Sequence, residues 1–397
     1  MTSRSRVHNG RLRAAVVGVG HLGRHHARIL GGMPDVELVA VVDTRIEQAR
    51  EIAQARGPLV QAYSEIGPLL EPEAQLDAVV VAVPTMLHHD VAIEFLRRGI
   101  SCLVEKPLAA ELGHAVALVN AARAGGAVLH VGHIERYNPV FEALQLTGFR
   151  PRVLMAERRG STNFRCLDVG VVLDLMIHDL DLILALVPSE PKTVHAVGLN
   201  VLGGHEDEAM AHVEFEDGTV AILTASRISD TTARTMRVWG DEGCVSIDFA
   251  ARSGATLRPT ESTRRGLDLD GLDRSRPETL RNHLFGKVLR IDPVHRDDGS
   301  NAPALAGPKQ PRLGVANFPS TMPTQREPLA IELEDFISAV VRGTSPRCSG
   351  LDALRAMRLA DQILRAIHSH RWTDPNSSEP IMGTLRPRPV EREAAWL

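Results

Sequence analysis

A strand-like run that ends in three spaced glycines constrains this 397-residue chain more than any other feature. Residues 14–17 are uniformly apolar, as in a buried parallel strand, and they lead into Gly18, Gly20 and Gly23 with the spacing G-x-G-x-x-G. The first glycine permits a tight turn, the second lets backbone approach a pyrophosphate, and the third lets a helix pack on the strand. That helix would begin with its N-terminus facing an anion. The pattern predicts a dinucleotide site, and the alternative is an unrelated turn in an α/β protein.

An acidic residue at the end of the next strand strengthens this prediction. The apolar run 37–42 ends in Asp43, at the separation where a carboxylate reaches the ribose hydroxyls of a dinucleotide. Such a carboxylate repels a 2′-phosphate and favours NAD, whereas Arg45, two residues later, partly offsets that repulsion and keeps NADP as an alternative. Asp43 can also serve as a helix N-cap, and the two roles are compatible. We therefore expect NAD as the cofactor.

Length and composition narrow the class of protein. A chain of this length exceeds what one hydrophobic core usually supports, so two domains are expected. The net charge of −4 and the scattered arginines give no case for nucleic-acid binding. No apolar run is long enough to span a membrane, and the first residues lack the apolar core of a signal peptide, so we expect a cytoplasmic protein. The four cysteines have no metal-site spacing, and free thiols are expected at Cys102, Cys166, Cys244 and Cys348.

Two types of organisation follow one another along the chain. Strand-like and helix-like segments alternate through residues 11–147, which predicts an NAD-binding Rossmann domain with a doubly wound parallel sheet. Short strands with hairpin turns then predict an α+β domain over residues 148–370, with an open, mainly antiparallel sheet and one face free for oligomer contacts. Within it, the Gly-, Pro- and Arg-rich residues 252–326 are expected to form an irregular insertion outside both cores. Residues 371–397 are expected to be a flexible tail.

Polar residues follow the strands of the first domain, at the sheet edge where such folds bind ligands. The turn and these segments supply the candidate cofactor contacts, namely Gly18, Gly20, His21, Leu22, Gly23, Asp43, Thr44, Arg45, Pro84, Thr85, His88, Glu105 and Lys106. The segment after the last strand adds candidate substrate contacts, namely Arg136, Tyr137 and Asn138. The imidazoles of the opening helix, including His26, are expected to serve surface and packing roles.

The residues that can move a proton lie in two places. Lys106 follows the fifth strand at the ligand edge, where it can act as general base for an alcohol, or it is a surface lysine that opens a loop. Asp174, His178 and Asp181 have the spacing i, i+4, i+7, which places them on one face of an otherwise apolar helix. A site on the cleft, with Asp181 as a substrate contact, explains this polar stripe, and a helix with one wet face is the alternative. No second His or Cys lies at ligand spacing nearby, so no metal site is expected.

Two arginines before that helix are further candidates. Arg158 and Arg165 can clamp a phosphate with their guanidinium groups, although a place on the surface is the alternative for each.

Several of these segments, in this order, resemble one known family. The segments GVGHLGRHHARIL, VEKPLA, VGHIERYNP, LDLMIHDLDLIL and EFEDGTVAILTASR resemble the Gfo/Idh/MocA family, named after glucose-fructose oxidoreductase and inositol dehydrogenase. The resemblance covers roughly residues 11–249 and 327–368. It implies a homodimer or homotetramer that oxidises or reduces sugars, cyclitols and related small molecules with NAD or NADP. It also implies Lys106 as a proton carrier and Asp174 and His178 of the D-x-x-x-H pattern as catalytic residues.

Within the family, two segments resemble one subgroup. GHIERYNP and DVGVVLDLMIHDLDLIL are similar to those of nucleotide-sugar 3-dehydrogenases, which act on UDP-N-acetylglucosamine or its uronic acid. The resemblance therefore implies NAD-dependent oxidation of the 3-hydroxyl of a UDP-N-acetylhexosamine. An inositol or free-sugar dehydrogenase is the alternative within the family, and a non-catalytic dinucleotide-binding regulator is the alternative of another class. The presence of Lys106, Asp174 and His178 together favours an enzyme.

Overall fold

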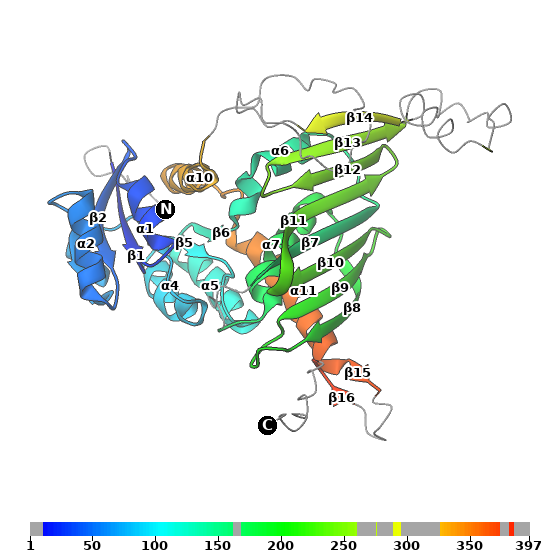
Figure 1. Cartoon of the computed structure of the whole chain (residues 1–397). Helices are drawn as coiled ribbons and strands as arrows, with labels where there is room; N and C mark the ends of the chain where they lie inside the picture. Colours follow the sequence, from blue (N-terminus) through cyan, green and yellow to red (C-terminus); the bar gives the residue numbers. More distant parts are fainter. Residues whose placement is uncertain are drawn as a thin grey trace, which may run out of the picture.

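The computed structural model describes residues 11–161, 168–259, 275, 289–294, 326–373 and 381–384. Two sheets, each with its own helices, lie next to each other (Figure 1). The N-terminal sheet is parallel and the second is mainly antiparallel, so the fold class predicted from the sequence is confirmed.

The first sheet has the strand order β3-β2-β1-β4-β5-β6, all parallel. Its strands are β1 (Leu12–Val17), β2 (Val36–Val42), β3 (Gln61–Tyr63), β4 (Ala78–Val81), β5 (Ser101–Glu105) and β6 (Leu129–Gly132). The connecting helices are α1 (Gly23–Leu30), α2 (Ile46–Arg56), α3 (Gly67–Leu70), η1 (Pro72–Ala74), η2 (Thr85–Leu87), α4 (His88–Arg97) and α5 (Leu112–Gly125). All four residues of β4 are buried, because helices cover both faces of the sheet. The strand order reverses between β1 and β4, which is where such sheets bind ligands at their carboxyl edge.

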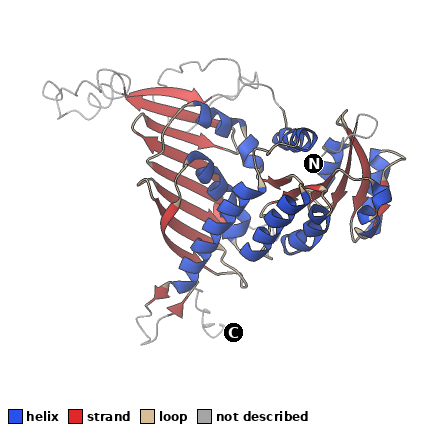
Figure 2. Cartoon of the chain, turned by 180° about the vertical axis from the view of Figure 1, so that it is seen from behind, coloured by secondary structure: helices blue, strands red, loops and turns tan. Residues whose placement is uncertain are grey.

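The second sheet has the order β14-β13-β12-β11-β7-β10-β9-β8. Its strands are β7 (Val153–Ser161), β8 (Pro191–Leu199), β9 (Glu208–Phe215), β10 (Val220–Ser226), β11 (Ile228–Gly240), β12 (Gly243–Asp248), β13 (Ser253–Pro259) and β14 (Leu289–Val294). Among the described strands of this second sheet, only β7 and β10 pair in parallel. Helices cover one face, as Figure 2 shows, and they are η3 (Ile134–Tyr137), α6 (Pro139–Leu146), η4 (Val172–Met176), α7 (Ile177–Leu186) and α11 (Gly350–Ser369). No described element covers the other face.

The first closing helix returns to the first sheet, which differs from the predicted division at residue 148. Helix α10 (Pro328–Arg342) buries Leu333 and Phe336 in one apolar cluster with Val16 and Leu103. Figure 1 shows α10 beside α1, far from the antiparallel strands. The sequence indicates that this segment is a helix with an apolar face, but the pattern does not reveal which sheet that face covers.

Two predictions of irregular structure were wrong for the residues that the structure describes. Within the expected insertion 252–326, β13 and β14 pair in antiparallel register and extend the second sheet. Within the expected flexible tail, β15 (Arg371–Trp372) pairs with β16 (Ile381–Met382). Strands at the edge of a sheet bury little of their surface. Their Arg- and Pro-rich sequences therefore lack the clear alternation of apolar and polar residues that predicts a strand. The remaining residues of both segments, apart from those named above, lie outside the described residues.

The described residues carry neither a membrane-spanning helix nor a metal-binding cluster. None of their helices is long and apolar enough to cross a membrane. No group of three His, Cys, Asp or Glu side chains among them is placed to hold a metal ion. Cys102, Cys244 and Cys348 are free thiols, and Cys166 lies outside the described part of the chain.

Candidate active site

The glycine turn has the geometry of a phosphate cradle. Gly18 has φ +83°, and a Cβ there would lie 2.6 Å from the carbonyl oxygen of Ala82. A Cβ on Gly23 would lie 1.7 Å from the oxygen of Gly18, so helix α1 can pack this closely only with glycine. By contrast, no atom lies within 4 Å of the corresponding position at Gly20. Helix α1 has no side-chain cap and no acid in its first turn, so its N-terminal N–H groups suit a dinucleotide phosphate.

Asp43 connects this turn to the end of β2. One carboxylate oxygen accepts from the backbone N–H of Val19 at 3.1 Å and the other from that of Arg45 at 3.0 Å. The N-cap of α2 is Arg45, so the alternative of Asp43 as the N-cap residue does not hold. The Arg45 side chain is 72% exposed, and Thr44, His21 and Leu22 are also exposed around the turn. The predicted cofactor residues that follow the first two strands therefore lie together around the glycine turn.

The next two strand ends are tied together by His88. Its Nδ1 lies 2.8 Å from the oxygen of Pro107 and its Nε2 lies 3.0 Å from that of Val83. Pro84 and Thr85 lie between these points in the chain, and Thr85 is buried. His88 is fully buried, so it supports the loop that carries Lys106 and has no open path to a ligand.

Lys106 reaches across to the second domain. Its Nζ donates to Asp174 Oδ1 at 2.9 Å and to the Asp174 backbone oxygen at 2.7 Å. The side chains of both residues are more than four-fifths buried. A surface lysine that opens a loop would not have these contacts, so the geometry favours the interpretation of Lys106 as part of a site.

Glu105, next to Lys106, is held by a histidine of helix α1. Its Oε1 lies 2.6 Å from Nε2 of His26, which is fully buried on α1 rather than on the surface. Although burial favours the neutral acid, the bond and charge of His26 hold the pKa of Glu105 below its ordinary value. Glu105 therefore braces the helix of the glycine turn against the lysine loop, and this buried position does not favour a direct contact with the cofactor.

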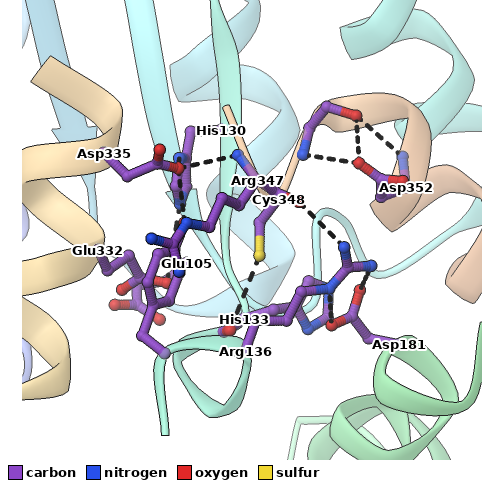
Figure 3. A network of polar contacts seen from close by, with 12 residues as sticks. Glu105, His130, His133, Arg136, Asp181, Glu332, Asp335, Arg347, Cys348 and Asp352 are labelled. Atoms are coloured by element: carbon purple, nitrogen blue, oxygen red, sulfur yellow. Dashed lines mark hydrogen bonds and ion pairs between the residues drawn. The ribbon is translucent and has the colours of Figure 1, made fainter. Parts of the chain in front are cut away.

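Behind this pair lies a group of buried polar residues from β6 and α10, shown in Figure 3. Glu332 Oε1 lies 3.8 Å from His130 Nε2, and neither oxygen of Glu332 has a hydrogen-bond partner in the described residues. Burial and the nearby Glu105 charge raise the pKa of Glu332 well above its ordinary value. Burial also lowers the pKa of His130 to about 4. Both shifts favour the neutral form of the group.

The predicted polar stripe is present, but it does not lie on one regular α-helix. Residues Val172–Met176 form the π-helix η4, and α7 begins only at Ile177. Because the π turn is wider than an α turn, the side chain of Asp174 does not lie on the same helix face as the residues that follow. As a result Asp174 contacts the lysine, whereas Asp181 is fully buried and pairs elsewhere.

His178 lies between Asp174 and Asp181 in the sequence. Its ring centroid is 6.4 Å from that of His133, and its Nδ1 is buried without a partner among the described residues. Burial, followed by the charges of Lys106 and Arg158, lowers the pKa of His178 well below its ordinary value. The imidazole is therefore neutral at neutral pH and can accept a proton.

Arg136 and Asp181 form a buried pair at the start of the second domain (Figure 3). Arg136 donates to both carboxylate oxygens of Asp181 at 2.7 and 2.6 Å, and to the backbone oxygen of Arg347 at 2.9 Å. The pair was predicted to bind substrate, but its hydrogen bonds are satisfied within the chain. This geometry supports a role in positioning α7.

The predicted substrate contact at Arg158 is not favoured either. Arg158 is buried, with Nη2 2.9 Å from Asp179 and Nη1 2.9 Å from Glu135. It is thus neither a surface arginine nor a free phosphate clamp. The wet helix face considered as the alternative for the polar stripe is not found, because Asp181 of that stripe is 1% exposed, and Asp179 on the adjacent face is 2% exposed.

Tyr137 and Asn138 are also structural in this geometry. The Tyr137 hydroxyl donates to Asp335 at 2.7 Å, and its side chain is fully buried. Asn138 caps α6 and donates to the backbone oxygen of Phe249 at 3.1 Å. Neither side chain is open to a ligand, because each is enclosed where segments distant in sequence meet. Arg165 lies outside the described residues.

Sequence reasoning missed Glu135, Asp179, His26 and His133 as supports of the site. One signal was present, since a carboxylate in an apolar helix needs a buried cation, although Arg158, which supplies it, is 21 residues away. The contacts of His26 carry no such signal, because Glu105 is 79 residues away.

This geometry defines an NAD-binding Rossmann protein whose second domain completes a polar site at the cofactor edge. Residues 12–133 match the model of the oxidoreductase family with an NAD-binding Rossmann fold, and residues 145–246 match the GFO/IDH/MocA C-terminal domain. The chain belongs to the GFO/IDH/MocA family of oxidoreductases.

Relatives across the family align over most of the chain. UDP-N-acetylglucosamine 3-dehydrogenase of Acidithiobacillus ferrooxidans is 33% identical over 90% of this chain and 98% of its own length. Inositol 2-dehydrogenase of Rhizobium meliloti is 27% identical over 91% and 98%. A solved structure of the Acidithiobacillus enzyme, GnnA, superposes with a TM-score of 0.71 at 31% identity, covering 90% of this chain and 97% of that one. The resemblance inferred from the sequence motifs is thus confirmed.

Proposed function

We propose that this chain oxidises the 3-hydroxyl of a UDP-N-acetylhexosamine to a ketone, with NAD as the acceptor. The similarity to UDP-N-acetylglucosamine 3-dehydrogenase over nearly the whole chain supports this substrate class. The observation that carries the chemistry is the contact of Lys106 with Asp174 across two domains, with His178 four residues further on. The site thus combines a lysine, a carboxylate and a neutral imidazole at the cofactor edge.

Two of these groups are proposed as proton carriers. Oxidation of an alcohol removes a hydride from carbon and a proton from oxygen, and NAD supplies the hydride acceptor when bound. His178 is neutral, so it can accept the hydroxyl proton directly. Lys106 can hydrogen-bond the same oxygen and pass the proton on, while Asp174 holds the ammonium in place.

We further propose that NAD is used in preference to NADP. The Asp43 carboxylate lies where the ribose of the dinucleotide is bound in this fold, and its charge opposes a 2′-phosphate. Its bonds to Val19 and Arg45 fix it beside the glycine turn, so it cannot swing away.

A panel of substrates tests the reaction. NAD reduction is measured with UDP-N-acetylglucosamine, its uronic acid, free sugars and inositols, and turnover of a UDP-sugar is expected. Positioned acid–base groups contribute about 10²–10⁴-fold, so Lys106→Ala and His178→Ala should each lower kcat by about that factor. NAD binding should be nearly intact in both variants.

Lys192→Ala is a matched control, because Lys192 is exposed on β8 and far from the site. It should retain wild-type turnover. Normal turnover by a Lys106→Ala/His178→Ala double variant would refute the proton carriers. Turnover of an inositol alone would move the substrate to the cyclitols, and NAD binding without any turnover would indicate the regulatory class.

For assembly we propose a homodimer or homotetramer in the cytoplasm, formed through the uncovered face of the second sheet. Apolar side chains gather on that face, where Met155 and Met210 are 40% and 46% exposed and Ile222 pairs in register with Met155. Light scattering should give a multiple of the protomer mass, and Met155→Glu should lower it. A monomeric wild-type protein at micromolar concentration would contradict this.

A further inference from the structure

An arginine on the inner face of the second sheet is not used by any contact described so far. Arg234 lies on β11 directly opposite Arg158 of β7 in the antiparallel register. Met236 and Val238, two and four residues further on, are buried, so the same side of the strand faces the helices. Arg234 therefore lies on the face that α7 covers, and β11, β7 and α7 are adjacent in Figure 1.

Arg158 and Arg234 differ in what balances their charge. Arg158 is enclosed by the carboxylates of Asp179 and Glu135. Arg234 is exposed, and no carboxylate of the described chain forms an ion pair with it. One cation of this facing pair is therefore neutralised within the protein, and the other is open to solvent beside the helix that carries His178.

The charge of Arg234 acts on the site itself. It is among the positive groups that lower the pKa of His178, and it also acts on Asp179, the next residue. Because Arg234 lies opposite Arg158 on the sheet face that α7 covers, its exposed guanidinium can contact a substrate whose hydroxyl lies at Lys106 and His178.

We propose that Arg234 binds a phosphate of the substrate and so selects nucleotide sugars over neutral sugars and cyclitols. The proposal deepens the function proposed above and rests on it. A guanidinium presents paired N–H donors that match two phosphate oxygens, which an ammonium cannot reproduce. The diphosphate of a UDP-sugar is a few bonds from C3 of the hexose, so one end of the molecule can be anchored while the other reacts.

The test compares Arg234→Ala, Arg234→Lys and a matched control. Arg123 is exposed on α5 without an ion pair in the described chain and lies in the other domain, so Arg123→Ala removes an equivalent surface charge. Loss of a charge-assisted contact should raise KM for UDP-N-acetylglucosamine about 10- to 100-fold in Arg234→Ala, with a much smaller change in kcat. Arg234→Lys should recover part of the loss. Arg123→Ala should match the wild type.

Two further readouts separate this proposal from a structural effect and from the proposed function. Titration of UDP alone should show a lower affinity for Arg234→Ala than for the wild type. Titration of N-acetylglucosamine 1-phosphate, which has a phosphate but no carboxylate, should show the same loss of affinity if Arg234 contacts a phosphate and not the carboxylate of a uronic acid. The acid limb of the kcat profile should move to higher pH in Arg234→Ala, because a positive charge near His178 is lost.

The outcomes are distinct. Arg234→Ala with UDP affinity and KM within about twofold of the wild type would overturn the phosphate site while leaving the reaction intact. Arg234-dependent binding of UDP by a protein that turns over no UDP-sugar would refute the proposed reaction and keep the anion site.

Discussion

Replacement of Arg158 by methionine tests how the helix of the site is held. Methionine retains an unbranched chain for packing, but it leaves the carboxylates of Asp179 and Glu135 buried without their cation. Removal of one partner from a buried ion pair costs about 3–5 kcal/mol, because the remaining charge is uncompensated. For a domain of this size the cost corresponds to a fall in Tm of about 6–20 °C.

The loss should depend on pH in a defined direction. Burial already raises the pKa of Asp179, and loss of Arg158 removes the largest opposing influence. A carboxyl group whose pKa is higher in the folded than in the unfolded state loses stability as the pH rises. The fall in Tm should therefore be larger at pH 8 than at pH 6, and Arg158→Met/Asp179→Asn should recover part of it.

Differential scanning calorimetry at both pH values measures this effect. Arg152→Met is the control, since Arg152 and its partner Asp241 are 59% and 74% exposed at 3.2 Å, and a shift below about 4 °C is expected. The reasoning is refuted if Arg158→Met shifts Tm at pH 8 by no more than the control does.

Three further predictions concern the cofactor, the buried acid and the imidazole. Asp43→Ala should lower the ratio of the Kd for NADP to the Kd for NAD, measured by titration of both cofactors. An unchanged ratio would exclude Asp43 as the group that selects NAD. Glu332→Gln should raise Tm at pH 8 and have little effect at about pH 4, because the raised pKa of Glu332 costs stability only where the unfolded carboxyl is ionised. Equal effects at both pH values would contradict this. Because burial lowers the pKa of His178, kcat should remain high at pH 6.5 and fall only at lower pH, and His178→Ala should abolish that limb.

The first domain could be predicted from sequence because its signals are local. The glycines at 18, 20 and 23 act on a turn of six residues, and Gly18 and Gly23 are required by contacts within that turn and with Ala82. Lys106 was found for the same reason, since the strand before it fixes its place at the sheet edge. Its partner Asp174 comes from 68 residues away, so only the likeness to the family connected the two.

The predicted substrate contacts that the geometry does not favour share one physical feature. Arg136, Tyr137, Asn138 and Arg158 have the side chains of a binding site, yet each finds its partner inside the chain. Composition identifies donors and acceptors, but it does not reveal whether a distant segment already satisfies them. Arg234 was overlooked for the converse reason, because its open position is defined only by the register with β7.

The proposed reacting groups come from both domains. Lys106 belongs to the Rossmann sheet, whereas its partner Asp174 and the nearby His178 belong to the second domain. Asp174, which joins the domains through Lys106, and Asp181, which is held by Arg136, bracket His178 on the chain. A change that loosens the domain contact must therefore also displace the proton carriers, because the same side chains hold the domains together and build the site.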